Sequence, residues 1–105
     1  MKDCHGAVAN ALSNFAGSDL LVADLGIAAP MDHLPGLLQK KIALGTKNCA
    51  EGAAMTRAQA IEAIEIGIEL AAAGVKNGVR CFLPGEMGIA NTTSSACVEI
   101  GRAHV

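Results

Sequence analysis

The chain has 105 residues, which is enough for one domain at most and short for an enzyme that must enclose two substrates. Hydrophobic residues make up 51% of it, and they include two Phe but no Trp or Tyr, a composition typical of helices packed closely on a sheet. The net charge is −2, without a basic block and with few rings for base stacking, so we expect no nucleic-acid partner.

The cysteines occur singly, and none belongs to a C-x-x-C pair that would indicate a zinc site or a redox motif. A disulfide framework fits the count, but in a reducing compartment we expect four buried thiols: Cys4, Cys49, Cys81 and Cys97. His5 follows Cys4 without a distant partner, so we expect no metal. Neither a signal peptide nor an apolar run of membrane-spanning length is visible, which predicts a cytoplasmic protein without membrane contact.

The first predicted elements are a helix and a strand. Residues 7–15 (AVANALSNF) have the pattern of a helix that ends at Gly17 and Ser18. Residues 20–25 (LLVADL) form a short apolar run ending at Gly26, which is typical of a buried parallel strand.

A segment rich in glycine and proline follows, from residue 30 to residue 54. We interpret it as a long loop with at most one helical turn around residues 37–42, and loops of this length in compact domains are usually functional. It carries three lysines that could neutralise a phosphate, although solvation is the more common state of such side chains: Lys40, Lys41 and Lys47.

A second helix is predicted to begin at Thr56, which forms a capping box with Gln59. Apolar residues recur at helical spacing at Ile61, Ile64, Ile68, Ala71 and Ala72, whereas Glu62, Glu65 and Glu69 occupy another face. Gly74 is the predicted end of this helix. Residues 79–83 (VRCFL) have the pattern of a second strand, and a third helix is predicted from about Thr92.

This order of elements predicts the α/β class. A strand, a helix and a second strand imply a parallel βαβ unit, so we expect residues 20–25 and 79–83 to be parallel neighbours or near neighbours. Ligands of such sheets lie beyond the carboxyl ends of the strands. Residues 26–54 and 85–93 would both begin at that edge, which makes them the candidate site.

Residues 85–93 read GEMGIANTT and have the features of an anion site. Gly85 and Gly88 allow close approach of the backbone, and the amides that open the next helix favour a phosphate. The spacing matches neither the dinucleotide fingerprint nor a P-loop, and glycines needed only for packing are the alternative explanation. A carboxylate would repel a phosphate, so Glu86 should face a ribose hydroxyl, a positively polarised ring, a backbone amide or solvent.

Three blocks follow one another in this chain: LLVADLGIA at 20–28, GTKNCAEGAAMTRAQA at 45–60 and GEMGIANTT at 85–93. In this order they resemble the nicotinate-nucleotide–dimethylbenzimidazole phosphoribosyltransferase family, which makes the lower-ligand nucleotide of cobalamin. Ala53 stands where the family usually has Pro, and Pro84 where a small flexible residue is common. Neither departure removes a polar group.

The resemblance implies a pentosyltransferase with a three-layer, Rossmann-like parallel sheet, of which this chain would be an internal, βαβ-containing fragment. The family transfers phosphoribose from nicotinate mononucleotide to 5,6-dimethylbenzimidazole, giving α-ribazole 5′-phosphate and nicotinate without a cofactor or metal. Carried over by position, the substrate-binding residues are Glu86, Gly88, Ile89, Ala90, Asn91, Thr92 and Thr93.

The resemblance also implies what this fragment lacks. The family's catalytic glutamate lies in a glutamate–glycine motif that has no counterpart here, so no catalytic residue is assigned and the fragment is expected to be inactive alone. Most of the benzimidazole pocket would precede Met1, and family members are homodimers. The alternative is a non-catalytic α/β module that binds phosphate or a nucleotide.

Residues 99–105 (EIGRAHV) are interpreted as a non-native tail, and residues 1–98 as the fragment of the phosphoribosyltransferase domain. One possible coding sequence of this tail, GAG-ATC-GGA-AGA-GCA-CAC-GTC, contains a widely used sequencing adapter. Adapter read-through is therefore the hypothesis for the end of the chain.

Overall fold

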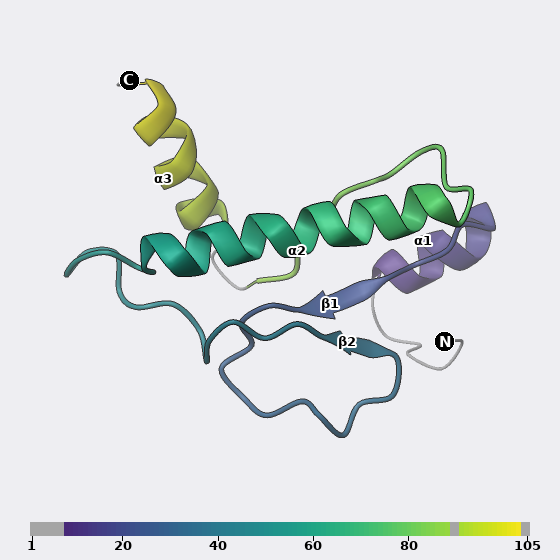
Figure 1. Cartoon of the computed structure of the whole chain (residues 1–105), viewed down its shortest axis with the longest axis horizontal. Coiled ribbons are helices and arrows are strands. Elements are labelled where there is room, and N and C mark those ends of the chain that lie inside the picture. The colour runs from purple at the N-terminus through teal and green to yellow at the C-terminus, as the bar shows by residue number, and fades with distance from the viewer. Residues whose placement is uncertain (1–7, 89–90, 104–105) are drawn as a thin grey trace.

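The computed structural model describes residues 8–88 and 91–103 (Figure 1). Helices and parallel strands occur together in it, which is the arrangement of a fragment of an α/β fold. In chain order the elements are α1 (Val8–Ala16), β1 (Val22–Asp24), β2 (Leu37–Gln39), α2 (Arg57–Lys76) and α3 (Asn91–Ala103).

The two strands form a parallel sheet in which Val22 is opposite Leu37 and Asp24 is opposite Gln39. The pairing continues past their carboxyl ends, because the amide of Lys40 donates to the carbonyl of Asp24 at 3.0 Å. The interpretation of residues 37–42 as loop or helical turn is therefore wrong for the first three of them. A run this short shows no periodicity, and it becomes a strand only because β1 lies beside it.

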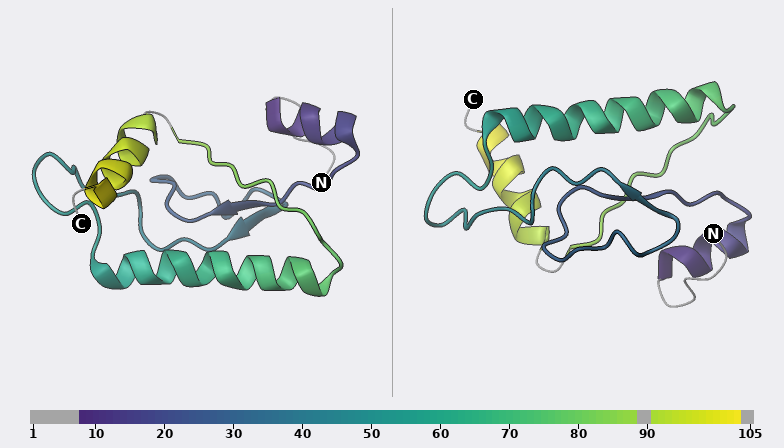
Figure 2. Two further views of the ribbon diagram at one scale, coloured as in Figure 1. Left: turned by 90° about the horizontal axis from the view of Figure 1, so that it is seen from above. Right: turned by 60° about the horizontal axis from the view of Figure 1, so that its bottom comes forward.

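The predicted partner of β1, residues 79–83, forms no strand although all five residues are described. This segment turns back at the end of α2 (Figure 1) and, in both views of Figure 2, moves away from the helix toward the strands. A Cβ placed on Gly74 of α2 would lie 2.7 Å from Cε1 of Phe82, so the Phe82 ring packs on the helix backbone. The prediction of a β1 pair with residues 79–83 is wrong, and β2 takes that place.

Helix α2 begins as predicted. The amide of Gln59 donates to Oγ1 of Thr56 at 3.2 Å, and the amide of Thr56 donates to Oε1 of Gln59 at 2.9 Å, which completes the capping box. The predicted end at Gly74 is wrong, because the residue with left-handed backbone is Gly78, at φ +88°. The amides of Gly78 and Val79 donate back to the carbonyls of Val75 and Gly74, each at 3.0 Å, as in a Schellman motif.

The face of α2 that packs inward differs from the predicted one. Ile66, 9% exposed, is the buried hydrophobic side chain among the described residues, and its half-buried neighbours on the same face are Gln59, Ala63, Leu70 and Gly74. The predicted apolar face is exposed, with Ile64 and Ile68 each 64% accessible. Because this helix is apolar on two opposite faces, it has the pattern of a helix covered on both sides in a larger protein.

The two shorter helices agree with the sequence. Helix α1 ends at Ala16, where Gly17 has φ +65° and the amide of Ser18 donates to the carbonyl of Ser13 at 3.0 Å. Helix α3 begins at Asn91, one residue before the predicted start. In the part of the chain that the structure describes, no helix combines the length and apolar character needed to cross a membrane.

The cysteines do not have the expected burial. Cys49, Cys81 and Cys97 are free and exposed, whereas Cys4 lies outside the described residues. Burial of a small thiol depends on which elements cover it, and the described elements leave these three uncovered.

We expect the two interior glycines of α2 to respond differently to alanine. Gly67→Ala should stabilise the helix by about 1 kcal/mol, because alanine has the higher helix propensity and no atom lies within 4 Å of the new methyl group. Gly74→Ala should gain less or lose stability, because its methyl group would displace the Phe82 ring. Thermal unfolding followed by circular dichroism measures both variants, and equal gains would contradict the packing of Phe82 on α2.

Candidate functional site

The glycine loop before α3 brings three of the predicted residues together. The amide of Asn91 donates to the carbonyl of Gly88 at 3.1 Å. A Cβ on Gly88 would lie 3.5 Å from Oε2 of Glu86 and 3.6 Å from Cβ of Asn91. The Glu86 carboxylate therefore lies beside Gly88 at the entry to the helix, while Ile89 and Ala90 lie outside the described residues.

The glycines of this loop are not required by backbone conformation. Positive φ angles occur at four other described glycines, and neither Gly85 nor Gly88 is among them. Ordinary residues can adopt the backbone of both positions, so the value of Gly88 to a ligand would lie in close approach and not in an unusual turn.

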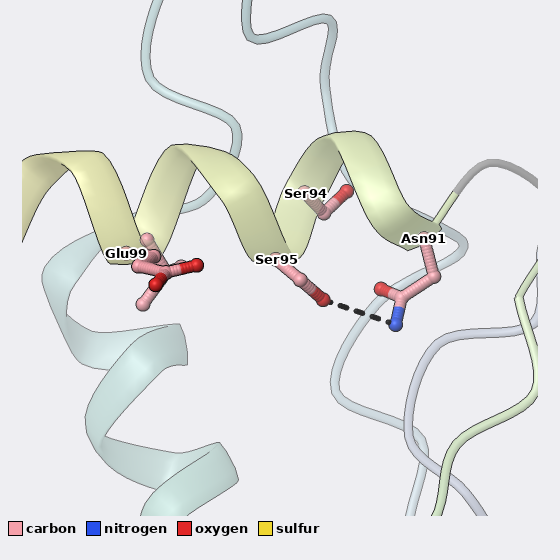
Figure 3. A pocket seen from close by; sticks show the side chains of 5 residues that line it. Asn91, Ser94, Ser95 and Glu99 are labelled. Atoms are coloured by element: carbon pink, nitrogen blue, oxygen red, sulfur yellow. Dashed lines mark hydrogen bonds between the residues drawn. The ribbon is translucent and has the colours of Figure 1, made fainter.

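One face of α3 continues from this loop. The side-chain amide of Asn91 donates to Oγ of Ser95 at 3.4 Å (Figure 3). A hollow runs along this face and is lined by Asn91, Ser94, Ser95, Val98 and Glu99. Because all of its lining comes from a single helix, this hollow cannot enclose a nucleotide without further chain; Thr92 and Thr93 are exposed beside it.

Helix α3 lies on the side of the molecule toward which both strands point (Figures 1 and 2). The segments that follow β1 and β2 begin on that side as well, as expected for a parallel pair. The glycine loop and the carboxyl ends of the strands are thus on the same side, which is where the sequence predicted the site.

At the carboxyl end of β1 lies a charged pair that the sequence analysis missed. Oδ2 of Asp24 is 2.9 Å from Nζ of Lys41, and the exposed fractions of the two side chains are 0% and 19%. Oδ1 of Asp24 accepts the amides of Gly26 at 3.0 Å and of Ile27 at 2.8 Å. Oδ2 of Asp24 accepts no hydrogen bond from the described residues. Its contact with Lys41 is an ion pair.

These contacts explain the ionisation of Asp24. The hydrogen bond from the Ile27 amide lowers the pKa of this carboxyl group, and the charge of Lys41 and the Gly26 amide act in the same direction against the effect of burial. The carboxyl group is therefore ionised at neutral pH in spite of its burial. One clue in the sequence was an aspartate at the end of an apolar run.

A second hollow, of about 260 Å³, lies next to this pair. Its walls come from the residues after β1, the residues after β2 and the first turns of α2: Leu25, Gly26, Ile42, Ala43, Gly45, Thr46, Met55, Gln59 and Ala63. No charged side chain lines it, so its surface suits an uncharged group better than a phosphate.

Among residues 8–88 and 91–103, no three His, Cys, Asp or Glu side chains gather as metal ligands would. Cys4 and His5 lie outside that part of the chain.

Comparison with known proteins defines the class of this chain. A family model described as "Phosphoribosyltransferase" matches residues 3–101, and the chain belongs to this family. Among its relatives is a protein of Geobacter metallireducens, 47% identical over 93 residues, named nicotinate-nucleotide–dimethylbenzimidazole phosphoribosyltransferase. Relatives of the same name in Halalkalibacterium halodurans and Dehalococcoides mccartyi are 43% and 46% identical.

Each of these three alignments covers 89% of this chain and 26% of the relative. The chain therefore spans about a quarter of the length of the curated relatives it matches. Variants of this chain can be tested in a full-length hybrid protein. In this hybrid, residues 3–98 of the chain replace the corresponding residues of the Geobacter metallireducens relative.

Acid should selectively remove the contribution of Asp24 to stability. Its pKa in the folded protein lies below the ordinary 3.8, so the ionised group stabilises the fold above that value, and this contribution is lost as the pH falls through the lowered pKa. Urea unfolding of the hybrid protein and its Asp24→Asn variant, from about pH 7 to about pH 3, measures the difference. We expect the difference in free energy of unfolding between the two proteins to be constant above about pH 5 and to become smaller in acid. A difference that does not depend on pH would contradict the lowered pKa of Asp24.

Proposed function

We propose that this chain is the glycine-loop segment of an enzyme that transfers phosphoribose from nicotinate mononucleotide to 5,6-dimethylbenzimidazole. The products are α-ribazole 5′-phosphate and nicotinate, and the step belongs to cobalamin biosynthesis. The observation that carries the proposal is the family match over residues 3–101, with relatives of that name up to 47% identical. Since the chain spans about a quarter of those relatives, the activity is proposed for the whole protein.

In this proposal the phosphoribosyl group binds where the glycine loop enters α3. The amide of Asn91 is bonded to the carbonyl of Gly88. The amides that follow it in the first turn and the helix dipole would favour the phosphate, and the hydroxyl groups of Thr92 and Thr93 would add donors. Glu86 lies beside Gly88 and carries a negative charge, so it is suited to accept a hydrogen bond from a ribose hydroxyl and not to contact the phosphate.

The proposed reaction requires this segment only to bind and align the sugar phosphate. The bond between the anomeric carbon and the nicotinate nitrogen breaks, and the electron pair stays on nicotinate, whose ring nitrogen was cationic in the nucleotide. The incoming benzimidazole nitrogen forms the new bond with inversion, and a carboxylate accepts the proton of the other ring nitrogen. We assign that carboxylate outside these 105 residues, so this segment binds and aligns the sugar phosphate.

The homodimeric state that the family resemblance implies and the cytoplasmic location predicted from the sequence are part of the same proposal. Size-exclusion chromatography with light scattering, applied to the hybrid protein, tests the dimer. A monomer at micromolar concentration would contradict it.

The hybrid protein should be active, whereas the isolated chain should make no measurable α-ribazole phosphate. The isolated chain lacks the general base, a contribution of about 10²–10⁴-fold, and most of the alignment of the incoming ring. Chromatography of incubations with nicotinate mononucleotide and dimethylbenzimidazole measures the product. Turnover by the isolated chain would show that a residue present here, such as Glu86, serves as the base. A hybrid that binds the nucleotide but does not turn over would favour the non-catalytic binding module.

In the hybrid protein, Gly88→Val should weaken binding of nicotinate mononucleotide by about tenfold, because the side chain would block the close approach of the ligand to the backbone. The atoms nearest to a Cβ at this position lie at ordinary contact distances, so the fold tolerates the first carbon of the new side chain. Gly85→Val tests the other glycine of the loop, which is not among the assigned substrate-binding residues; no atom lies within 4 Å of a new Cβ there, and its effect on nucleotide binding should be smaller. Calorimetry with each substrate measures the effect, and equal loss of both substrates would indicate a folding defect.

We also propose that residues 99–105 derive from adapter read-through. The family match ends at residue 101, inside this segment, so the residues after it have no counterpart in the family model. The underlying nucleotide sequence tests the proposal, and any codon run other than the adapter sequence refutes it.

A further inference from the structure

Two consecutive lysines leave β2 in opposite directions. Nζ of Lys40 forms a salt bridge with Glu69 on α2, with both carboxylate oxygens within 3.0 Å. Lys41 instead turns back to the segment that follows β1. Such alternation is expected of extended backbone, and it gives the two ammonium groups different environments.

The ammonium group of Lys41 is bound by three groups of this chain. It donates to the carbonyl of Ile27 at 2.7 Å and of Ala29 at 2.8 Å, and it lies 2.9 Å from Oδ2 of Asp24. Two of its three N–H donors are bonded to carbonyl groups, and its charge is balanced by Asp24, so it is poorly suited to neutralise a phosphate. With the two amides bound to Oδ1 of Asp24, the backbone from residue 24 to residue 29 is wrapped around a single ion pair.

The same pair directly precedes, in both segments, residues that line the apolar hollow. Leu25 and Gly26 on one wall directly follow Asp24, and Ile42 and Ala43 on another directly follow Lys41. The amide of Ile42 also donates to the carbonyl of Leu25 at 3.0 Å. The pair and this hydrogen bond together fix how far apart the two walls stand at the carboxyl ends of the strands.

We propose that Asp24 and Lys41 are positioning residues of the transferase, whose ion pair holds residues 25–29 and the walls of the apolar hollow in the geometry that substrate binding requires. This inference rests on the proposed function, since it assigns the carboxyl edge of the sheet to the substrates of that reaction. The two residues act through the backbone that they order and do not contact the reacting atoms.

The test compares variants of the hybrid protein by steady-state kinetics, with rates expressed per folded enzyme. In Asp24→Asn and Lys41→Met we expect KM for at least one of the two substrates to rise about tenfold, while kcat changes less than about threefold. The double variant should be no worse than either single variant, because each change already removes the same pair. Lys41→Arg keeps the charge and the donors and should restore KM to within about threefold of the unmodified hybrid.

Lys40→Met is the matched control, because it removes the neighbouring lysine and an exposed ion pair on the other side of β2. It should leave both KM values unchanged. Hydrogen exchange gives a second readout, in which the amides of Gly26 and Ile27 lose protection in the Asp24 and Lys41 variants only.

Two failures are distinguishable. If the unmodified hybrid makes no α-ribazole phosphate, the proposed function is overturned, and with it this inference. If the unmodified hybrid is active but Asp24→Asn and Lys41→Met only lower stability and leave both KM values unchanged, the pair is merely structural and this inference alone is overturned.

Discussion

The ion pair between Asp24 and Lys41 is the constraint on which the rest of the structure depends. A carboxylate without solvent contact is tolerated only when a cation and hydrogen-bond donors surround it, and Lys41 and the amides of Gly26 and Ile27 supply both. Among the described residues, Ile66 is the buried hydrophobic side chain, so apolar packing alone does not fix the ends of the strands. Electrostatics and backbone hydrogen bonds define this edge of the sheet.

The exposed apolar surface follows from how much of the fold is present. Helix α2 has apolar residues on two opposite faces, and the face that contains Ile66 is the partly buried one. A chain that spans about a quarter of its relatives cannot supply both covering layers, because each layer of an α/β domain needs its own elements. In the whole protein we expect the exposed isoleucine face of α2 to be covered. Most of the residues that pack on it would then belong to other parts of the protein.

Local features of the sequence predicted most of the helix ends, although not the end of α2. The capping box at Thr56, helix α1 with its glycine end and the start of α3 after the glycine loop all depend on residues within a few positions of one another. Strand pairing was not predictable in this way. Residues 79–83 have a strand pattern without a strand partner, whereas Leu37 and Leu38 become part of a strand because β1 lies beside them. The prediction of buried cysteines was wrong for the same reason, because the burial of a side chain depends on elements that are distant in the sequence.

For the candidate site, the assignment of the glycine loop stays a prediction, and the sequence did not show which partners the lysines have. Lys41 is neutralised by Asp24 and Lys40 by Glu69, so neither has an uncompensated charge to offer a phosphate. The two carboxylates of the region differ in the same way, since Asp24 is held in the fold while Glu86 stays exposed beside Gly88. A phosphate at this edge would therefore depend on the amides and hydroxyl groups that open α3 more than on these two lysines. In the proposed function, such a site would hold the sugar phosphate by geometry, and it would require a rigid backbone around Asp24.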